Sequence, residues 1–114
     1  MATASYAILG QASPAGSNST LYAVPASTQA VLSTLAVCNT TASAATATIY
    51  VCKASGTTPA SPATTNALIY QMSIAANTTQ TFTIGVSLAP YDTIYVASGT
   101  SGSLTFHAFG SQIA

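Results

Sequence analysis

The sequence predicts an all-β fold: one antiparallel β-sandwich, or a jelly-roll-like domain, of about eight strands. Apolar runs rich in Ile, Val, Tyr and Thr recur along the chain, and such runs are typical of strands. The segments between them are rich in Ser, Pro, Gly and Asn, which favour turns. Within several runs apolar and polar residues alternate, which indicates strands with one buried face. With 114 residues, we expect a single domain, 1–114.

The runs predict the following strands in chain order. The first, Ser5–Gly10, is either an edge strand of the domain's own sheet or part of an N-terminal arm, 1–17, that docks on another subunit. The other predicted strands are Thr20–Val24, Ala30–Asn39, Ala45–Lys53, Ala67–Ile74, Gln80–Leu88, Thr93–Ala97 and Leu104–Phe109. Between them, Ala54–Asn66 is a long loop with no apolar anchor, so it is either mobile or ordered by a neighbouring subunit.

Alternation within the strands predicts which side chains share a face. One face of Ala67–Ile74 carries Leu68, Tyr70, Met72 and Ile74. One face of Gln80–Leu88 carries Phe82, Ile84, Val86 and Leu88. Between Ala30 and Lys53, the residues assigned to the inside are Val31, Leu35, Val37, Ala47, Ile49 and Val51. The intervening TTASA, residues 40–44, would then turn a long hairpin.

Charged side chains are nearly absent. They make up 2% of the sequence, whereas an ordinary soluble domain has roughly 25%. Lys53 and Asp92 are the only fully charged residues. Binding to nucleic acid or to an anionic membrane needs clustered Lys or Arg, so neither partner is expected. A neutral surface of short side chains favours permanent association with other protein subunits.

The residues needed for catalysis or metal binding are mostly missing. Acid–base catalysis by paired carboxylates needs two Asp or Glu residues, and Asp92 is the only one in the sequence. A serine, His107 and Asp92 could formally make up a catalytic triad. We do not expect one, because no serine lies in a nucleophile-elbow motif and a single His with a single Asp is what chance provides. Cys38, Cys52 and His107 leave a zinc site one ligand short. We therefore predict no enzymatic activity, no cofactor and no metal.

The two cysteines are predicted to be free thiols. In the expected hairpin, Cys52 lies opposite Leu32 or Ser33, and roughly 17–20 Å of strand separates that position from Cys38. A disulfide needs Cα atoms within about 7 Å of each other. Free thiols also fit folding in a reducing cytoplasm, which the lack of a secretory signal at the start of the sequence predicts.

Three segments of the chain resemble small virion proteins of tailed phages. Thr20–Val51, with its VPA and VCN motifs, is similar to one segment of those proteins. Ile69–Ser98, with LAPYD, is similar to a later one, and the ending SLTFHAFGSQIA is similar to their closing strand. The order and spacing agree over most of the chain, so the resemblance is more specific than any single motif.

The resemblance implies a virion structural protein without a catalytic site. The positions that it carries over as fold-defining are Val24–Pro25, Cys38–Asn39, Leu88, Asp92 and Phe109–Gly110. Relatives commonly have Arg near the position of Thr46–Thr48, where this chain is neutral, so a salt bridge is not expected there.

The leading functional hypothesis is a capsid decoration, or cement, protein that stabilises a phage head. The resemblance implies a homo-oligomer, expected to be a trimer, that contacts the major capsid protein or another virion protein and is made in the host cytoplasm. Exposed aromatic residues and the N-terminal segment provide the candidate interface residues: Tyr6, Ile8, Leu9, Tyr91, Tyr95, His107, Phe109 and Ile113. The alternatives are a tail, baseplate or fibre component, which copy number would separate from a head protein, and a glycan-binding module.

Overall fold

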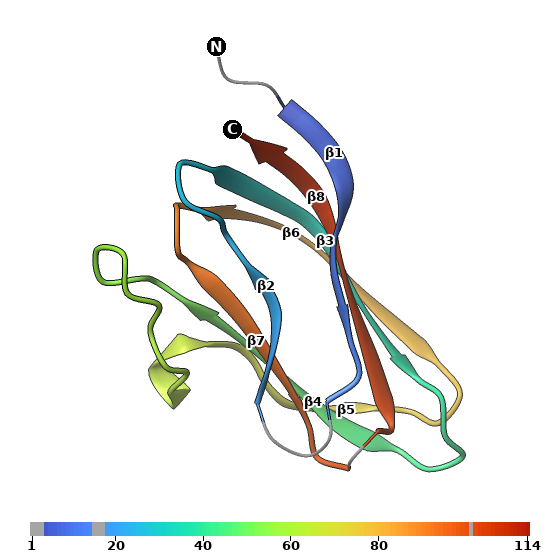
Figure 1. The fold of residues 1–114 in the computed structure, drawn as a ribbon. Helices are drawn as coiled ribbons and strands as arrows, with labels where there is room; N and C mark the ends of the chain where they lie inside the picture. The colour runs from blue at the N-terminus through green and yellow to red at the C-terminus, as the bar shows by residue number, and fades with distance from the viewer. Residues whose placement is uncertain (1–3, 15–17, 101) are drawn as a thin grey trace.

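The computed structural model describes residues 4–14, 18–100 and 102–114, and its regular structure is almost entirely β-strand (Figure 1). The strands are β1 (Ala4–Ala12), β2 (Ser19–Ala23), β3 (Gln29–Asn39), β4 (Ala45–Cys52), β5 (Ala67–Ile74), β6 (Thr79–Leu88), β7 (Thr93–Ser98) and β8 (Leu104–Ile113). The predicted strands are confirmed, with small shifts at their ends. The described ranges hold no helix with the length and hydropathy that crossing a membrane needs.

The strands form two four-stranded antiparallel sheets that pack face to face (Figure 1). The order is β1-β8-β3-β6 in one sheet, here the β1 sheet, and β2-β7-β4-β5 in the other, the β2 sheet. Only β4 and β5 are both consecutive in the chain and paired. All other connections between consecutive strands cross from one sheet to the other. This interleaved order of eight strands is that of a jelly roll, one of the two architectures that the sequence predicts.

The hairpin predicted between Ala30 and Lys53 is wrong. β3 pairs with β6 and β8, whereas β4 pairs with β5 and β7, so residues 40–44 cross between the sheets. The buried side chain of Asn39 holds this crossing. Its amide nitrogen donates to the carbonyl oxygens of Ser43 (2.9 Å) and Ile74 (3.0 Å), and its oxygen accepts from the backbone N–H (2.9 Å) and hydroxyl (2.7 Å) of Thr41.

Cys38 and Cys52 are both free, as predicted, although the reason differs from the one expected. They do not lie along one hairpin, because Cys38 belongs to the β1 sheet and Cys52 to the β2 sheet. Burial raises the pKa of the Cys52 thiol, because a thiolate loses its hydration in the core. Cys52 therefore keeps its proton and packs as a small apolar residue.

A bulge in β3 explains why the predicted inside position of Val31 is wrong. Leu32 pairs with Gly110 and Thr34 with Phe109, so Ser33 is an extra residue on β3. Its hydroxyl donates to the Phe109 carbonyl oxygen at 3.1 Å. An extra residue reverses the inside and outside faces of a strand. As a result Leu32 is fully buried while Val31 is 39% exposed, and Leu35 and Val37 remain inside as predicted.

A second bulge, in β5, reverses the predicted faces of Leu68 and Tyr70. Met72 pairs with Ala47 and Ile69 with Ile49, which leaves one residue too many on β5. Gln71 takes a positive φ of 50° there, and its backbone N–H donates to the Thr48 hydroxyl at 3.1 Å. Ile69 therefore packs against the core, and Leu68 and Tyr70 are exposed by 45% and 53%.

The core lies between the two sheets. Its largest fully buried side chains are Phe106, Leu32, Leu35, Ile49, Ile74 and Ile94. Ala47 and Ile49 are buried as predicted, and Val51 is partly buried against them. The predicted face of β6 is also confirmed: Leu88 is buried, and Phe82, Ile84 and Val86 pack partly buried against the core.

The first predicted strand is an edge strand of the domain's own sheet. β1 pairs antiparallel with β8, from Ala4 opposite Ile113 to Ala12 opposite Phe106. The remaining parts of the predicted arm, 1–3 and 15–17, lie outside the described residues. The long loop after β4 contains a β-bridge between Ser55 and Thr58 and a short 3-10 helix, η1 (Thr64–Asn66).

Candidate interaction surface

The outer face of the β1 sheet brings together four of the eight candidate interface residues: Tyr6, Ile8, His107 and Phe109. Ile8 of β1 lies directly opposite Phe109 of β8, and Tyr6 lies opposite Ser111. On β8, Phe106 and Ala108 point into the core, so His107 and Phe109 point outward. We call this outer face the β1–β8 surface and include in it the exposed Val31 of β3, which lies opposite Ser111.

Two rings of the β1–β8 surface, those of His107 and Phe109, are held in place by their neighbours. The rings of His107 and Phe109 stack, with centroids 6.3 Å apart and planes inclined by 7°. The amide nitrogen of Gln11 lies 3.0 Å from His107 Nδ1, across the β1–β8 pair. A stacked ring pair loses little conformational entropy on binding, which suits a contact surface.

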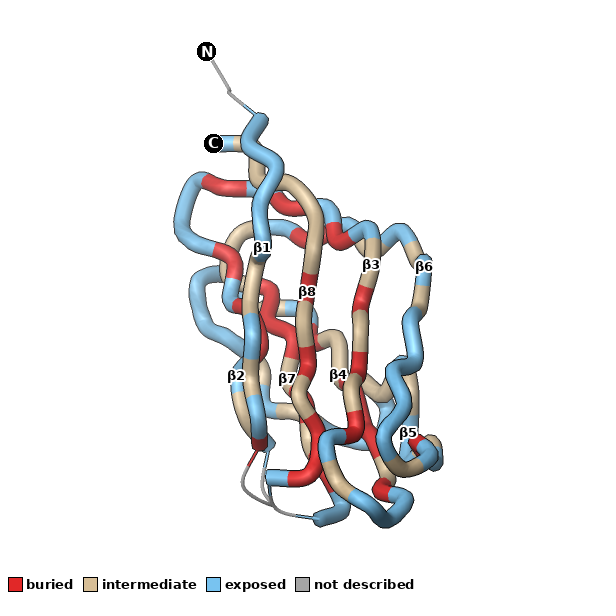
Figure 2. Tube along the Cα trace, turned by 90° about the vertical axis from the view of Figure 1, so that its right-hand side faces the viewer, coloured by how far each residue is buried: buried red, intermediate tan, exposed pale blue. Residues whose placement is uncertain are grey.

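Apolar exposure is concentrated at one end of this surface. Tyr6 is 87% exposed, Ile8 58% and Val31 39%. Beside them lies a shallow hollow of about 560 Å³, whose lining is mainly apolar and includes Tyr6, Val31 and Phe109. Figure 2 shows that the first half of β1 is exposed at the end of the molecule where both termini lie. These large exposed apolar side chains make this end of the β1–β8 surface the candidate interaction site.

The other four candidate residues lie elsewhere. Leu9 packs against the core. Tyr95 is on the outer face of the β2 sheet, opposite Tyr50. Tyr91 is in the turn between β6 and β7 with a φ of 71°. Ile113 pairs with Ala4 and lines a groove at the end of the sandwich. The eight candidates therefore do not form one site.

Sequence reasoning missed Val31, Leu68 and Tyr70 as surface residues. Each was assigned by uninterrupted alternation, and each lies on the far side of a bulge from the residues that define the buried face. Neither Ser33 nor Gln71 is a glycine, which is the residue that most often reveals such an irregularity in a sequence. No local feature of the sequence therefore identifies these three residues as exposed.

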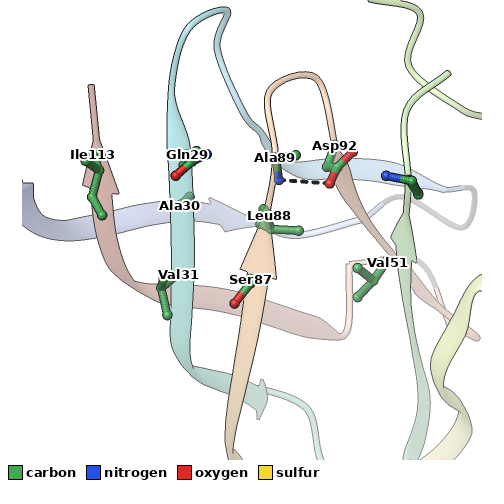
Figure 3. A pocket seen from close by; sticks show the side chains of 10 residues that line it. Gln29, Ala30, Val31, Val51, Ser87, Leu88, Ala89, Asp92 and Ile113 are labelled. Atoms are coloured by element: carbon green, nitrogen blue, oxygen red, sulfur yellow. Dashed lines mark hydrogen bonds between the residues drawn. The ribbon is translucent and has the colours of Figure 1, made fainter. Parts of the chain in front are cut away.

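Both charged residues lie at a second concave feature, a groove at the same end of the molecule. Strand ends from both sheets form it, with apolar walls that include Val31, Val51 and Leu88, as Figure 3 shows. Lys53 and Asp92 line it as well, and its volume is about 520 Å³. The groove is therefore largely apolar, with the chain's only two formal charges at its margin.

Asp92 has a structural role at this groove. It is 8% exposed, and each of its carboxylate oxygens accepts a backbone N–H: Oδ1 from Ala54 at 2.8 Å and Oδ2 from Ala89 at 2.9 Å. Its own backbone carbonyl accepts from the N–H of Val24 at 3.0 Å. With these bonds the buried carboxylate of Asp92 joins strand ends from both sheets.

The only histidine and the only acidic residue of the chain lie apart in the structure. His107 contacts Gln11 and Phe109 on the outer face, whereas Asp92 bonds to backbone groups at the groove, so the two do not form part of a triad. Within the described ranges, no group of three or more His, Cys, Asp or Glu side chains is placed to hold a metal ion. What the surface can offer is apolar contact area with scattered hydroxyl groups.

The fold has counterparts among solved structures. No protein-family model and no curated protein matches the sequence. The chain is similar to one from the crystal structure of the T13 viral particle of infectious bursal disease virus, with a TM-score of 0.50, 14% identity and coverage of 99% of this chain and 30% of that chain. It is also similar to a chain of the Gx strain of that virus, with a TM-score of 0.48, 16% identity and coverage of 99% and 31%.

The described chain thus spans just under a third of the length of these viral chains. At an identity of 14%, the likeness to the T13 particle shows a common fold and nothing finer. That fold is the β-sandwich described above.

Proposed function

We propose that this chain is a non-enzymatic structural protein of a virus particle, and that it decorates and stabilises the outside of a tailed-phage head. The observation that carries the proposal is the uncharged β1–β8 surface, where Tyr6, Ile8 and Val31 are exposed around an apolar hollow. A decoration protein needs contact area rather than chemistry, and this surface offers contact area.

Two further observations support a role in a virus particle. Jelly rolls are common in viral capsids, and the fold is like that of a chain in a solved viral particle. The resemblance of Thr20–Val51 and Ile69–Ser98 to tailed-phage virion proteins points the same way, and it is the reason for naming a phage. Jelly rolls also occur in lectins and cupins, so the fold alone does not carry the proposal.

The partners that we propose are other copies of this chain, arranged as a trimer, and the major capsid protein. Near-neutral surfaces do not repel one another and do not leave desolvated charges when they are buried, which favours a permanent assembly. Closed symmetry is the usual outcome for such assemblies. In this proposal the chain is made in the host cytoplasm and ends in the virion.

Quantitative mass spectrometry of purified virions tests the location. A ratio to the major capsid protein of about one, or about one-half, supports a head decoration protein, because copies then follow the symmetry of the shell. A ratio of a few per cent of that value would move the chain to the tail, baseplate or fibre. Absence from the particle would overturn the virion role.

A second experiment tests the stabilising role itself. Heads assembled without this chain should open at lower temperature than heads to which the purified chain has been added back. Substitution of Tyr6 and Ile8 by Ser should abolish the gain, because the apolar contact area is lost. The matched control is substitution of Leu68 and Tyr70 by Ser on the β2 sheet. A gain that survives the first pair of changes would show that another surface contacts the shell.

A further inference from the structure

The two halves of β1 differ in what covers them. In the second half, Leu9 packs against the core and Ala12 pairs with the buried Phe106. In the first half, the five residues Ala4–Ile8 are all exposed. A strand that lies over a core alternates between buried and exposed residues. Residues 4–8 therefore project beyond the core with both faces open to solvent, as the continuous exposure of this segment in Figure 2 shows.

This half of β1 also has a free backbone edge. β1 is the first strand in the order β1-β8-β3-β6, so one row of its N–H and C=O groups points away from β8. The register with β8 has no shift from Ala4 to Ile8. The segment contains neither proline nor a charged residue. Ala4–Ile8 therefore lacks the proline, the charge and the internal bulge that often keep an edge strand from pairing with another chain, and the register shift of β1 comes only after it, between Ile8 and Gly10.

The other three sheet edges are less open to pairing. β2 has only five residues and a register shift. β5 has two register shifts, and the positive φ of Gln71 breaks its line. β6 is long, but the exposed residues on it are Thr, Gln, Ser and Gly, with no apolar side chain to add contact energy. Of the four edges, only β1 combines a straight free backbone with large exposed apolar side chains.

The chemistry of the surroundings selects the partner. The β1–β8 surface carries no charged residue, because Lys53 and Asp92 both lie at the groove. An ordinary protein surface would bring charges into this contact and lose their hydration, at a cost of several kcal/mol for each unpaired ion. A second copy of this chain brings charged residues at only 2% of its sequence. It is therefore the partner whose surface best complements an uncharged one.

The area that a stable interface needs is a modest share of the surface of this chain. A stable interface buries about 800 Å² on each partner, roughly one-seventh of what this chain exposes, since its total accessible surface is 5788 Å². Strand pairing along Ala4–Ile8 would supply backbone hydrogen bonds, and Tyr6 and Ile8 would supply apolar contact beside the hollow.

We propose that the Ala4–Ile8 edge of β1 pairs with the same edge of a second copy of this chain, so that a β-sheet continues across a two-fold contact between subunits, separate from the three-fold contact of the proposed trimer. This inference rests on the assembly role proposed above, but its test does not depend on any virus particle. If the chain does not self-associate through β1, the head location is still decided by the copy count in virions. If the copy count rules out the head, the pairing through β1 is still decided by sedimentation.

Sedimentation of the purified chain over a wide range of concentration tests the proposal. Changing Tyr6 and Ile8 together to Ser should raise the dissociation constant of the oligomer by about 100-fold, the effect of removing two central apolar contacts. The matched control changes Leu68 and Tyr70 to Ser, since these are also an exposed aliphatic residue and an exposed tyrosine on an edge strand. It should leave the dissociation constant nearly unchanged.

Hydrogen exchange separates strand pairing from side-chain contact alone. Half of the amides in Ala4–Ile8 should become protected when the wild-type chain is concentrated, because alternate N–H groups point to the free edge. Amides of β6 should not change. A wild-type chain that stays monomeric, equal weakening by the two pairs of substitutions, or unchanged exchange in Ala4–Ile8 would each overturn the proposal. Because all four substituted side chains are exposed, the variants should keep the wild-type stability.

Discussion

At the end of the sandwich where β3 leads into β4, buried polar side chains bond within the chain, whereas at the opposite end apolar side chains face solvent. The first, here the Asn39 end, contains the four hydrogen bonds of Asn39 and a buried contact of 3.0 Å between the hydroxyl oxygens of Ser98 and Ser103. The second, the Asp92 end, contains the groove and the exposed Tyr6, Ile8 and Val31.

The difference between the two ends separates stability from assembly. Polar groups that find their partners inside the chain need nothing from another molecule. Exposed apolar groups gain free energy only when a partner removes them from water. The buried polar contacts of the Asn39 end are therefore expected to matter for folding, and the exposed apolar side chains of the Asp92 end for association. The following changes test this separation, from the largest expected effect to the smallest.

Changing Asn39 to Ala should have the largest effect on folding. It leaves the Ile74 carbonyl and the Thr41 N–H without their side-chain partner, and Asn39 itself is only 1% exposed. We expect a loss of about 4 kcal/mol in the free energy of unfolding, measured by urea titration. The exposed Asn18 changed to Ala is the control. If the loss of stability is no larger than that of the control, the side chain of Asn39 does not stabilise the fold.

Changing Gly110 to Ala should cost about 3 kcal/mol, because the added Cβ has no room. Built at this position, the Cβ would overlap the backbone carbonyl of Val31 on the neighbouring strand. Gly85 on β6 is the matched control, since nothing lies within 4 Å of its Cβ position. We expect Gly85→Ala to leave the denaturation midpoint nearly unchanged. Equal effects of the two substitutions would mean that β8 and β3 separate easily at this end.

Asp92, like Gly110, stabilises the fold from the end that carries the exposed apolar side chains, because its carboxylate bonds to backbone groups. Asn at this position keeps the shape but replaces one acceptor oxygen by an NH₂ group that faces a backbone N–H. We expect Asp92→Asn to lower the free energy of unfolding by about 2 kcal/mol, less than the change at Asn39. Thermal unfolding at neutral pH measures it. A cost above that of Asn39→Ala would reverse the ranking of the two ends.

The smallest expected effect concerns Tyr22, whose buried hydroxyl has no hydrogen-bond partner among the described residues. Tyr22→Phe removes an unsatisfied polar group, so we expect a gain of up to about 1 kcal/mol in stability. A loss of stability instead would reveal a partner for the hydroxyl.

The pH dependence of this effect follows from the pKa. Burial raises the pKa of Tyr22 in the folded chain, because the phenolate loses its hydration there. Below the unfolded pKa of about 10 both states hold the proton, so the advantage of the Phe variant is constant. Above that pH the unfolded wild type ionises first, and wild-type stability falls as pH rises toward the folded pKa. The advantage of Phe should therefore grow above pH 10, as unfolding at several alkaline pH values will measure.

The positions of the strands could be predicted from the sequence, because alternation and turn residues are local properties. Ala67–Ile74 has the predicted bounds, and the buried face of β6 is the predicted one. The near absence of charge, which directs the functional reasoning toward assembly, is also a property of composition alone. Four residues of the candidate site could also be predicted from the sequence: Tyr6, Ile8, His107 and Phe109.

The assignment of strands to sheets, and the side chains that become exposed beyond a bulge, depend on contacts between distant parts of the chain. Residues 40–44 suit either a hairpin or a crossing between sheets, because the same small polar residues satisfy both. Which of the two forms depends on the strands that pair with β3, and these are β6 and β8 rather than β4. Likewise, the bulges at Ser33 and Gln71 follow from how each strand meets its neighbours. The exposure of Val31 and Tyr70 depends on those strand pairings. Because the pairings join residues that are far apart in the chain, local sequence patterns do not reveal them.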